Sequence, residues 1–156
     1  MNILIAILAL NLIVIVHELG HYLVAKGFNI KVLEFSLFFG PKLFSVKKGE
    51  TIYSLRLFPV GAFVQLEGEE EASLSARAFS NKPLAARAAV VAAGPLMNFL
   101  TAMLFLAIAF LIGGYSSNLL ETVPPGSPAA QAGLQRGDRI ISYDGKRVYQ
   151  PADFFT

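Results

Sequence analysis

The sequence predicts an α-helical membrane protein with two transmembrane helices, a membrane-associated β region between them, and the start of a small α/β domain at the end. Two long apolar stretches, a 54% share of hydrophobic residues and a mean hydropathy of +0.56 support this fold class. Soluble domains of this length are less apolar. We therefore divide the chain into residues 1–25, 26–83, 84–115 and 119–156.

Residues 1–25 are predicted to form the first transmembrane helix. Apart from His17, Glu18 and His21, this segment has no Asp, Glu, Lys, Arg or His, and it exceeds the roughly 20 residues that cross a hydrocarbon core of about 30 Å. A cleaved signal peptide is the alternative interpretation. No basic residues precede the apolar run, however, and the run is long, so a retained helix is favoured.

Residues 26–83 are predicted to form a β region and a polar linker. Residues 44–46 and 51–58 have the composition of strands, and Lys47-Lys48-Gly49-Glu50 between them is typical of a hairpin turn. The region is unusually apolar for a connection, with phenylalanine at positions 35, 38, 39, 44, 58 and 63. We therefore expect it to associate with the membrane.

Residues 84–115 are predicted to form the second transmembrane helix. Ser80-Asn81-Lys82-Pro83 is a helix start signal, since proline suits the first turn. The stretch 88–115 has no charged side chain and would be about 40 Å long as a straight helix. Tilt, or a kink at Pro95, is therefore expected.

The composition changes at about residue 119, where Pro, Gly and charged residues become frequent. Ser127 can cap a short helix that begins at Pro128. Residues 139–143 can form a strand, and Asp144-Gly145 is typical of a tight turn. The tail 119–156 therefore indicates the start of a separate small domain.

The basic residues predict an orientation. Nine of the thirteen Lys and Arg lie between the two apolar stretches, four follow the second, and none precede the first. The positive-inside rule then places residues 26–83 in the cytoplasm and both ends of the chain outside. Basic residues are interleaved with acidic ones, so no nucleic-acid partner is expected. The chain has no cysteine, which excludes disulfides and thiolate chemistry.

The motif His17-Glu18-Leu19-Gly20-His21 carries the chemistry. On a helix, His17 and His21 lie one turn apart on one face, so both imidazoles can reach one metal ion with Glu18 beside it as a general base. Ionisable groups inside a membrane helix are costly, which favours function over a chance match with two buried histidines. The pattern indicates a zinc protease of the His-Glu-x-x-His type, with zinc as its cofactor.

Catalytic zinc sites normally have three protein ligands and a water. No third ligand is evident here: Asp138, Asp144 and Asp153 lie in the predicted outside tail. Glutamates in the connecting region lack a ligand-like setting. We therefore expect the third ligand beyond Thr156, with weak zinc binding by residues 1–156 alone.

Gly94-Pro95-Leu96-Met97-Asn98 interrupts the second apolar stretch. Pro95 frees a backbone carbonyl, and Asn98 brings an amide to membrane depth. Gly94, Pro95 and Asn98 could line the active site and hold water or substrate backbone. Alternatively, Asn98 only joins neighbouring helices, and Gly20 only permits close packing.

These motifs, in order, resemble the site-2 protease family of intramembrane metalloproteases (peptidase family M50), in particular its bacterial branch with the regulator of sigma-E protease. The resemblance covers nearly the whole chain. Besides the histidine motif, it rests on Phe38-Phe39-Gly40-Pro41, Pro59-Val60-Gly61-Ala62-Phe63-Val64, Phe79-Ser80-Asn81-Lys82-Pro83 with Arg87, and Ala93-Gly94-Pro95-Leu96-Met97-Asn98. The tail from Val123 resembles the start of a PDZ domain.

The resemblance implies a multi-pass enzyme of the bacterial inner membrane that performs regulated intramembrane proteolysis. It implies that His17 and His21 bind zinc, that Glu18 is the catalytic base and that Asn98 lines the active site. The implied substrates are single-span membrane proteins such as anti-sigma factors or signal-peptide remnants. It further implies that substrate pairs with an edge of the β region, and that the PDZ-like tail filters substrates outside.

One feature departs from the family's pattern. The family's third ligand is an aspartate in a Leu-Asp-Gly setting on a later helix, whereas here Tyr143 precedes Asp144-Gly145 in a predicted hairpin. The chain therefore resembles an N-terminal fragment, expected to be inactive alone. A catalytically inactive, membrane-tethered PDZ adaptor and a metal transporter are the competing interpretations. The intact Glu18 argues against the first, and the small number of spans against the second.

Overall fold

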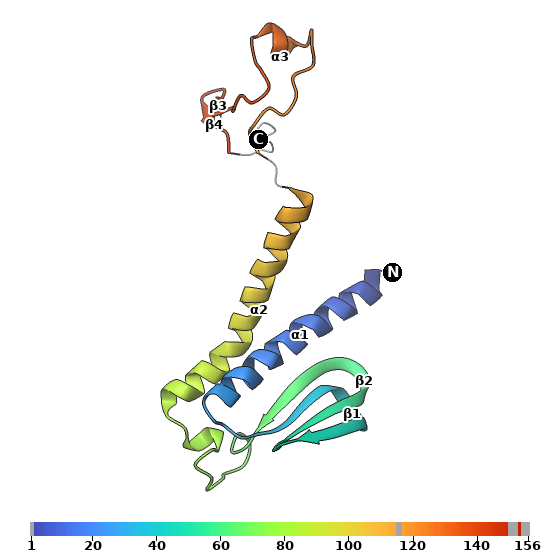
Figure 1. The fold of residues 1–156 in the computed structure, drawn as a ribbon, viewed down its shortest axis with the longest axis vertical. Helices are drawn as coiled ribbons and strands as arrows, with labels where there is room; N and C mark the ends of the chain where they lie inside the picture. The colour runs from blue at the N-terminus through green and yellow to red at the C-terminus, as the bar shows by residue number, and fades with distance from the viewer. Residues whose placement is uncertain (1, 115–116, 150–152, 154–156) are drawn as a thin grey trace. The chain divides into compact units, whose positions relative to one another are not determined.

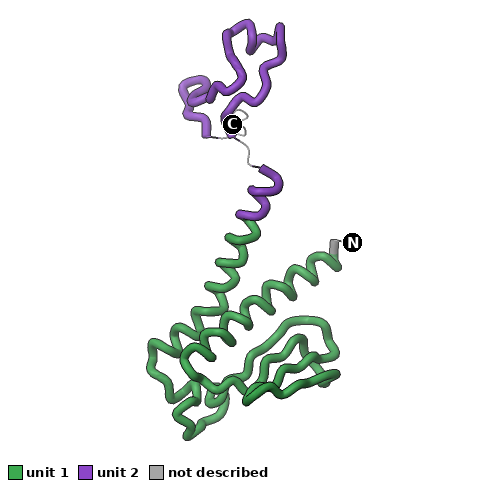
Figure 2. The backbone as a smooth tube through the Cα atoms, viewed as in Figure 1, with its two compact units in different colours: residues 1–106 green, residues 107–156 purple. Residues whose placement is uncertain are grey.

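The computed structural model describes residues 2–114, 117–149 and 153 (Figure 1). The described elements are α1 (Asn2–Gly27), β1 (Val32–Lys48), β2 (Thr51–Leu66), the short 3-10 helix η1 (Phe79–Asn81), α2 (Leu84–Gly113), α3 (Pro128–Gln131), β3 (Ser142–Tyr143) and β4 (Lys146–Arg147). The chain divides into two compact units, residues 1–106 and 107–156 (Figure 2). Tyr115 and residues 150–152 and 154–156, which belong to the predicted second span and tail, lie outside the described residues.

Helices α1 and α2 are both long and apolar enough to cross a membrane. Most of their large side chains are exposed, among them Leu4, Leu104 and Phe105. An apolar surface of this extent is what lipid would cover. The predicted fold class is confirmed to this extent: two helices able to span a membrane, with a small antiparallel sheet between them in the chain.

Strands β1 and β2 form the sheet, and each is long enough to pair with the other in two places. Glu34 on β1 pairs with Ile52 at the start of β2 and with Gln65 at its end. The second half of β1 pairs only with the first half of β2, from Lys48 opposite Thr51 onward. The predicted hairpin is confirmed, with Gly49 at φ 65° in its turn. One edge of the sheet is therefore the last part of β2, and the other is the second half of β1.

A charged cluster holds the folded-over sheet together. Glu34, with 8% of its side chain exposed, accepts hydrogen bonds from Lys42 (2.7 Å), Ser54 and Arg56 (2.8 Å). Burial alone would raise the pKa of Glu34, but the three donors outweigh it and lower the pKa to about 2. The Arg56 guanidinium also donates to the carbonyl of Gly40 at 2.9 Å. These bonds link three sections of the sheet.

The sheet lies along α1 (Figure 1). Asn11 on α1 holds the bend of β2 at Pro59 and Gly61. The Asn11 amide donates to the carbonyl of Pro59 at 3.0 Å and accepts from the N–H of Gly61 at 2.8 Å. Fifteen residues separate Asn11 from Lys26 near the end of α1, a rise of about 22 Å. The sheet therefore contacts α1 from Asn11 to Lys26, which is most of the length of the helix.

Near the C-terminal end of α1, an ion-pair network and an apolar core join the remaining parts of the first unit. Glu50 accepts from Lys26 at 3.0 Å and from both terminal nitrogens of Arg77 at 2.6 and 2.7 Å. These bonds, from Arg77 first and then Lys26, lower the pKa of Glu50 to about 2. Beside them is the core of the unit, formed by Ala25, Ile30, Val32, Leu66 and Val90.

In the second unit, the predicted helix cap and tight turn are confirmed, whereas the predicted strand is shorter than expected. The Ser127 side chain accepts from the N–H of Ala130, and α3 begins at Pro128 as predicted. Asp144 and Gly145 have φ 49° and 75° and connect β3 to β4 as the predicted tight turn. The strand expected at 139–143 is shorter: only Ser142–Tyr143 pairs with β4, while Arg139 forms an isolated bridge with Leu119.

Candidate metal centre and active site

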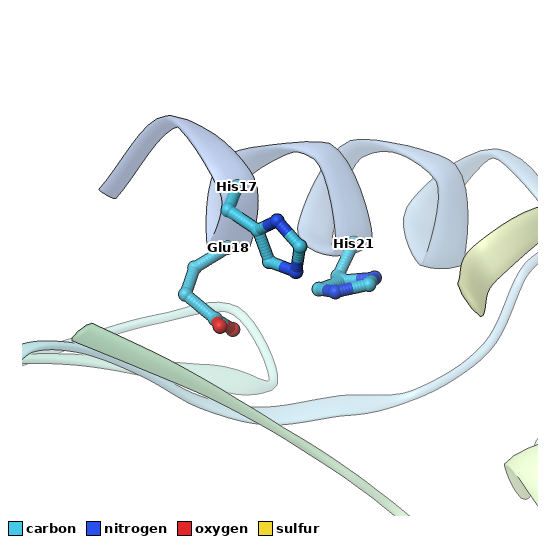
Figure 3. A group of neighbouring side chains, drawn as sticks. All are labelled: His17, Glu18 and His21. Atoms are coloured by element: carbon cyan, nitrogen blue, oxygen red, sulfur yellow. The ribbon is translucent and has the colours of Figure 1, made fainter. Parts of the chain in front are cut away.

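His17, Glu18 and His21 project from one side of α1 (Figure 3). One donor atom from each residue lies within 4.8 Å of the others, and all three residues are half-buried. The two imidazole rings meet edge to face, with centroids 4.8 Å apart. The four-residue spacing predicted from the sequence thus gathers two nitrogens and a carboxylate at one point, on a helix able to span a membrane.

The second helix orients the imidazole of His21. Its Nδ1 lies 2.7 Å from the carbonyl oxygen of Val90 on α2. A carbonyl only accepts hydrogen bonds, so in the neutral ring Nδ1 carries the proton and Nε2 carries the lone pair. A backbone carbonyl bound to the far nitrogen is the usual partner of a metal-ligating histidine. Nε2 of His21 is therefore ready to bind a metal.

Asn98 contacts the other histidine. Its Nδ2 lies 3.2 Å from Nδ1 of His17, and its Oδ1 is buried without a hydrogen-bond partner among the described residues. The sequence named Asn98 as a residue that could line the site or only join helices, and the structure places it beside His17.

Gly94 leaves open the space that both histidines face. A Cβ at this position would lie 2.5 Å from Nε2 of His17 and 2.6 Å from Nε2 of His21. The neighbouring Pro95 is exposed. Gly20 serves the packing of the two helices instead, because its Cβ would lie 2.5 Å from the carbonyl oxygen of Ala93. Gly94 and Gly20 thus have different functions at the same crossing.

The edge of the sheet holds Glu18. The backbone N–H of Val64 on β2 donates to Oε2 of Glu18 at 3.1 Å. In Figure 3 the carboxylate points away from α1 toward the strand. The other oxygen, Oε1, has no such bond within the described part of the chain, so it is available to accept a proton.

A pocket of about 300 Å³ opens beside Glu18 and His21. Its other lining residues come from β2, from the linker and from the start of α2: Phe63, Val64, Leu66, Glu69, Phe79, Val90 and Val91. The pocket therefore combines mostly apolar walls with the carboxylates of Glu18 and Glu69.

The arrangement fits a zinc ion. Two imidazoles whose Nε2 atoms face the same space, with a nearby carboxylate, are the donor set of zinc proteases, and Gly94 leaves that space open. No further His, Cys, Asp or Glu joins the cluster in the part of the chain that the structure describes. Val64 and Val90 were not predicted, because they act through backbone atoms that have no residue signature.

Comparison with known proteins decides the family. The model of peptidase family M50 matches residues 5–152. The chain belongs to peptidase family M50. Within this family, the helix that carries His17, Glu18 and His21 and the helix that carries Asn98 both fall inside the matched range.

Curated relatives agree with the assignment to family M50. A protein of Clostridium perfringens named "Putative zinc metalloprotease" is 40% identical over 99% of this chain and 46% of its own length. A protein of Thermotoga maritima with the same name is 43% identical over 92% of this chain and 30% of its own length. A third, from Clostridium acetobutylicum, is 39% identical over 95% of this chain and 44% of its own. The chain thus spans less than half the length of each.

Proposed function

We propose that the protein is an intramembrane zinc metalloendopeptidase that hydrolyses peptide bonds within the membrane segments of single-span proteins. The observation that carries the proposal is the cluster of His17, Glu18 and His21, with donor atoms within 4.8 Å on a helix able to cross a membrane. Membership of family M50 and the names of the relatives support the same chemistry.

Each residue of the cluster then has a role. A bound zinc ion would polarise the scissile carbonyl and acidify a water. His17 and His21 would hold it through Nε2. Glu18, fixed by the Val64 N–H at Oε2, accepts the proton of the attacking water at Oε1 and returns it to the leaving amine. The pocket beside Glu18 receives the scissile segment.

We propose that residues 26–83 enter the membrane from the cytoplasmic side. The contact of Pro59 and Gly61 with Asn11 supports this, because Asn11 lies well inside the apolar part of α1. Irregular backbone at membrane depth is tolerated where protein covers it or water reaches it. The exposed edge of β2 beside Glu18 would be satisfied by water or by an extended substrate strand.

The remaining parts of the proposal concern segments beyond the site. The chain covers less than half of its relatives' length, and we propose that a segment after Thr156 supplies the third ligand, so that residues 1–156 alone bind zinc weakly. We propose that residues 119–156 begin a PDZ-like domain outside a bacterial inner membrane, where it selects trimmed substrates such as anti-sigma factors or signal-peptide remnants.

The test is a cleavage assay with full-length protein in liposomes and a single-span substrate whose outer domain has been trimmed. We expect Glu18→Gln to lower the cleavage rate about 10²- to 10⁴-fold, the usual contribution of a general base, with bound zinc retained. Glu70→Gln is the matched control, because it makes the same change at an exposed position outside the pocket.

Two results would reject parts of the proposal. Cleavage that persists in Glu18→Gln would remove Glu18 from the mechanism. Wild-type protein that binds zinc and retains the substrates but cleaves none of a panel would favour the membrane-tethered adaptor instead.

A further inference from the structure

Helix α2 touches both metal-motif histidines with residues spaced one turn apart. Val90, Gly94 and Asn98 follow one another at four-residue intervals, so they form a stripe on one face of the helix. Val90 meets Nδ1 of His21, Gly94 faces the Nε2 atoms of both rings, and Asn98 meets Nδ1 of His17. This stripe is the immediate surroundings of the predicted ligands, and Asn98 has the one side-chain polar group in it.

The contact between Asn98 and His17 is incompatible with metal binding as it stands. Because the amide nitrogen faces Nδ1, the neutral imidazole must accept there and carry its proton on Nε2. That proton would occupy the nitrogen that Gly94 leaves open. The same orientation leaves Oδ1 of Asn98 buried without a partner in the described structure. In this orientation Nε2 of His17 is protonated where a metal would bind, and Oδ1 of Asn98 has no hydrogen-bond partner in the described structure.

Half a turn of the amide about its last bond resolves both difficulties. We propose that Asn98 is a positioning residue for His17: in the folded protein, before metal binds as well as after, its Oδ1 accepts the Nδ1–H of His17 and directs the Nε2 lone pair toward the metal position. His17 then has the same arrangement that the Val90 carbonyl gives to His21. An acceptor bound to the far nitrogen fixes ring orientation and tautomer and raises the basicity of the ligand.

The turned amide also changes what Asn98 offers to its surroundings. Its NH₂ group replaces the unpartnered oxygen and provides a donor at that position. That position is buried, so the donor faces the protein interior. Asn98 then orients His17 with its oxygen, which simple joining of helices would not require.

The inference rests on the proposed metal site but not on proteolysis, so its test avoids cleavage. Full-length Glu18→Gln protein would be labelled with ¹⁵N-histidine, and the tautomer of each ring read by NMR without metal at mildly alkaline pH. Zinc affinity would be measured separately by competition with a chelator. His17 and His21 are the two histidines of residues 1–156, and each signal is assigned by its loss on substitution, so that His21 serves as an internal control in every variant.

We expect His17 to carry its proton on Nδ1 in the Glu18→Gln protein. Asn98→Leu should shift His17 toward the Nε2–H form and lower zinc affinity about 10- to 100-fold, while His21 remains unchanged. Asn98→Asp keeps an acceptor and should preserve the Nδ1–H form. Phe99→Leu, at an exposed neighbouring position, should change neither quantity.

The inference is overturned if Asn98→Leu leaves the His17 tautomer and the zinc affinity as they are. It is also overturned if both histidine signals change together, since that would show a general loss of helix packing. Loss of zinc binding by the parent protein would instead reject the proposed function, and the tautomer of His17 would still decide whether Asn98 orients it.

Discussion

The space beside Gly94 allows a sharp test of the metal centre, because filling it should remove zinc without unfolding the protein. In Gly94→Ala the new Cβ would lie 2.5 and 2.6 Å from the Nε2 atoms of His17 and His21, whereas ordinary contacts begin at 3.4 Å. The nitrogens would therefore move by about 0.8–0.9 Å. Zinc sites tolerate about 0.2 Å in ligand distance.

The expected loss of zinc affinity is about 10²-fold or more, or roughly 2.8 kcal/mol. Folding should change little. The imidazoles can rotate aside at a cost of about 0.5–1.5 kcal/mol each, and alanine favours a helix over glycine by about 1 kcal/mol. The prediction for Gly94→Ala is therefore a protein with a nearly normal Tm that has lost its metal.

The assay is a zinc competition titration of purified full-length protein, with Tm measured on the same samples. Gly113→Ala is the matched control, since a Cβ there has nothing within 4 Å and it lies on the same helix. Gly20→Ala should do the opposite of Gly94→Ala and lower Tm, because its Cβ meets the Ala93 backbone. Zinc affinity of Gly94→Ala within about threefold of wild type, in a folded protein, would refute the reasoning.

Two further predictions concern the sheet. Asn11→Leu leaves the Gly61 N–H without its acceptor and should destabilise the protein by about 1–3 kcal/mol, seen as a lower Tm in detergent, whereas the exposed Leu10→Ile should not; equal Tm values would contradict this. The pKa values of Glu34 and Glu50 are both lowered to about 2 from 4.5, and a lowered folded pKa stabilises the fold above the unfolded value. Tm should therefore be highest above about pH 5 and fall as the pH drops toward 2, and a profile that is flat over this range would show that these ion pairs contribute nothing.

The sequence predicted the elements whose signal is local. The spacing of His17 and His21 fixes their common face on any helix, and length with composition identifies both apolar helices. Asn98 was noticed because an amide is unusual in an apolar stretch. Its partner, His17, could not be predicted from spacing, because 81 residues separate the two.

Other contacts had no signal of their own. Asn11 was counted only as part of an apolar helix, although it holds the bend of β2. Val64 and Val90 hold Glu18 and His21 through backbone atoms, which every residue possesses. β1 and β2 pair not only next to the hairpin turn but also between the start of β1 and the end of β2. A single hairpin pattern does not reveal the register of this second pairing.

The stripe formed by Val90, Gly94 and Asn98 has a consequence for biosynthesis. The motif histidines lie on α1, but the groups that orient them lie on α2, which is made about 70–80 residues later. A chain with only α1 inserted therefore has the motif without its geometry. Metal loading would then report that both helices have inserted and packed in register.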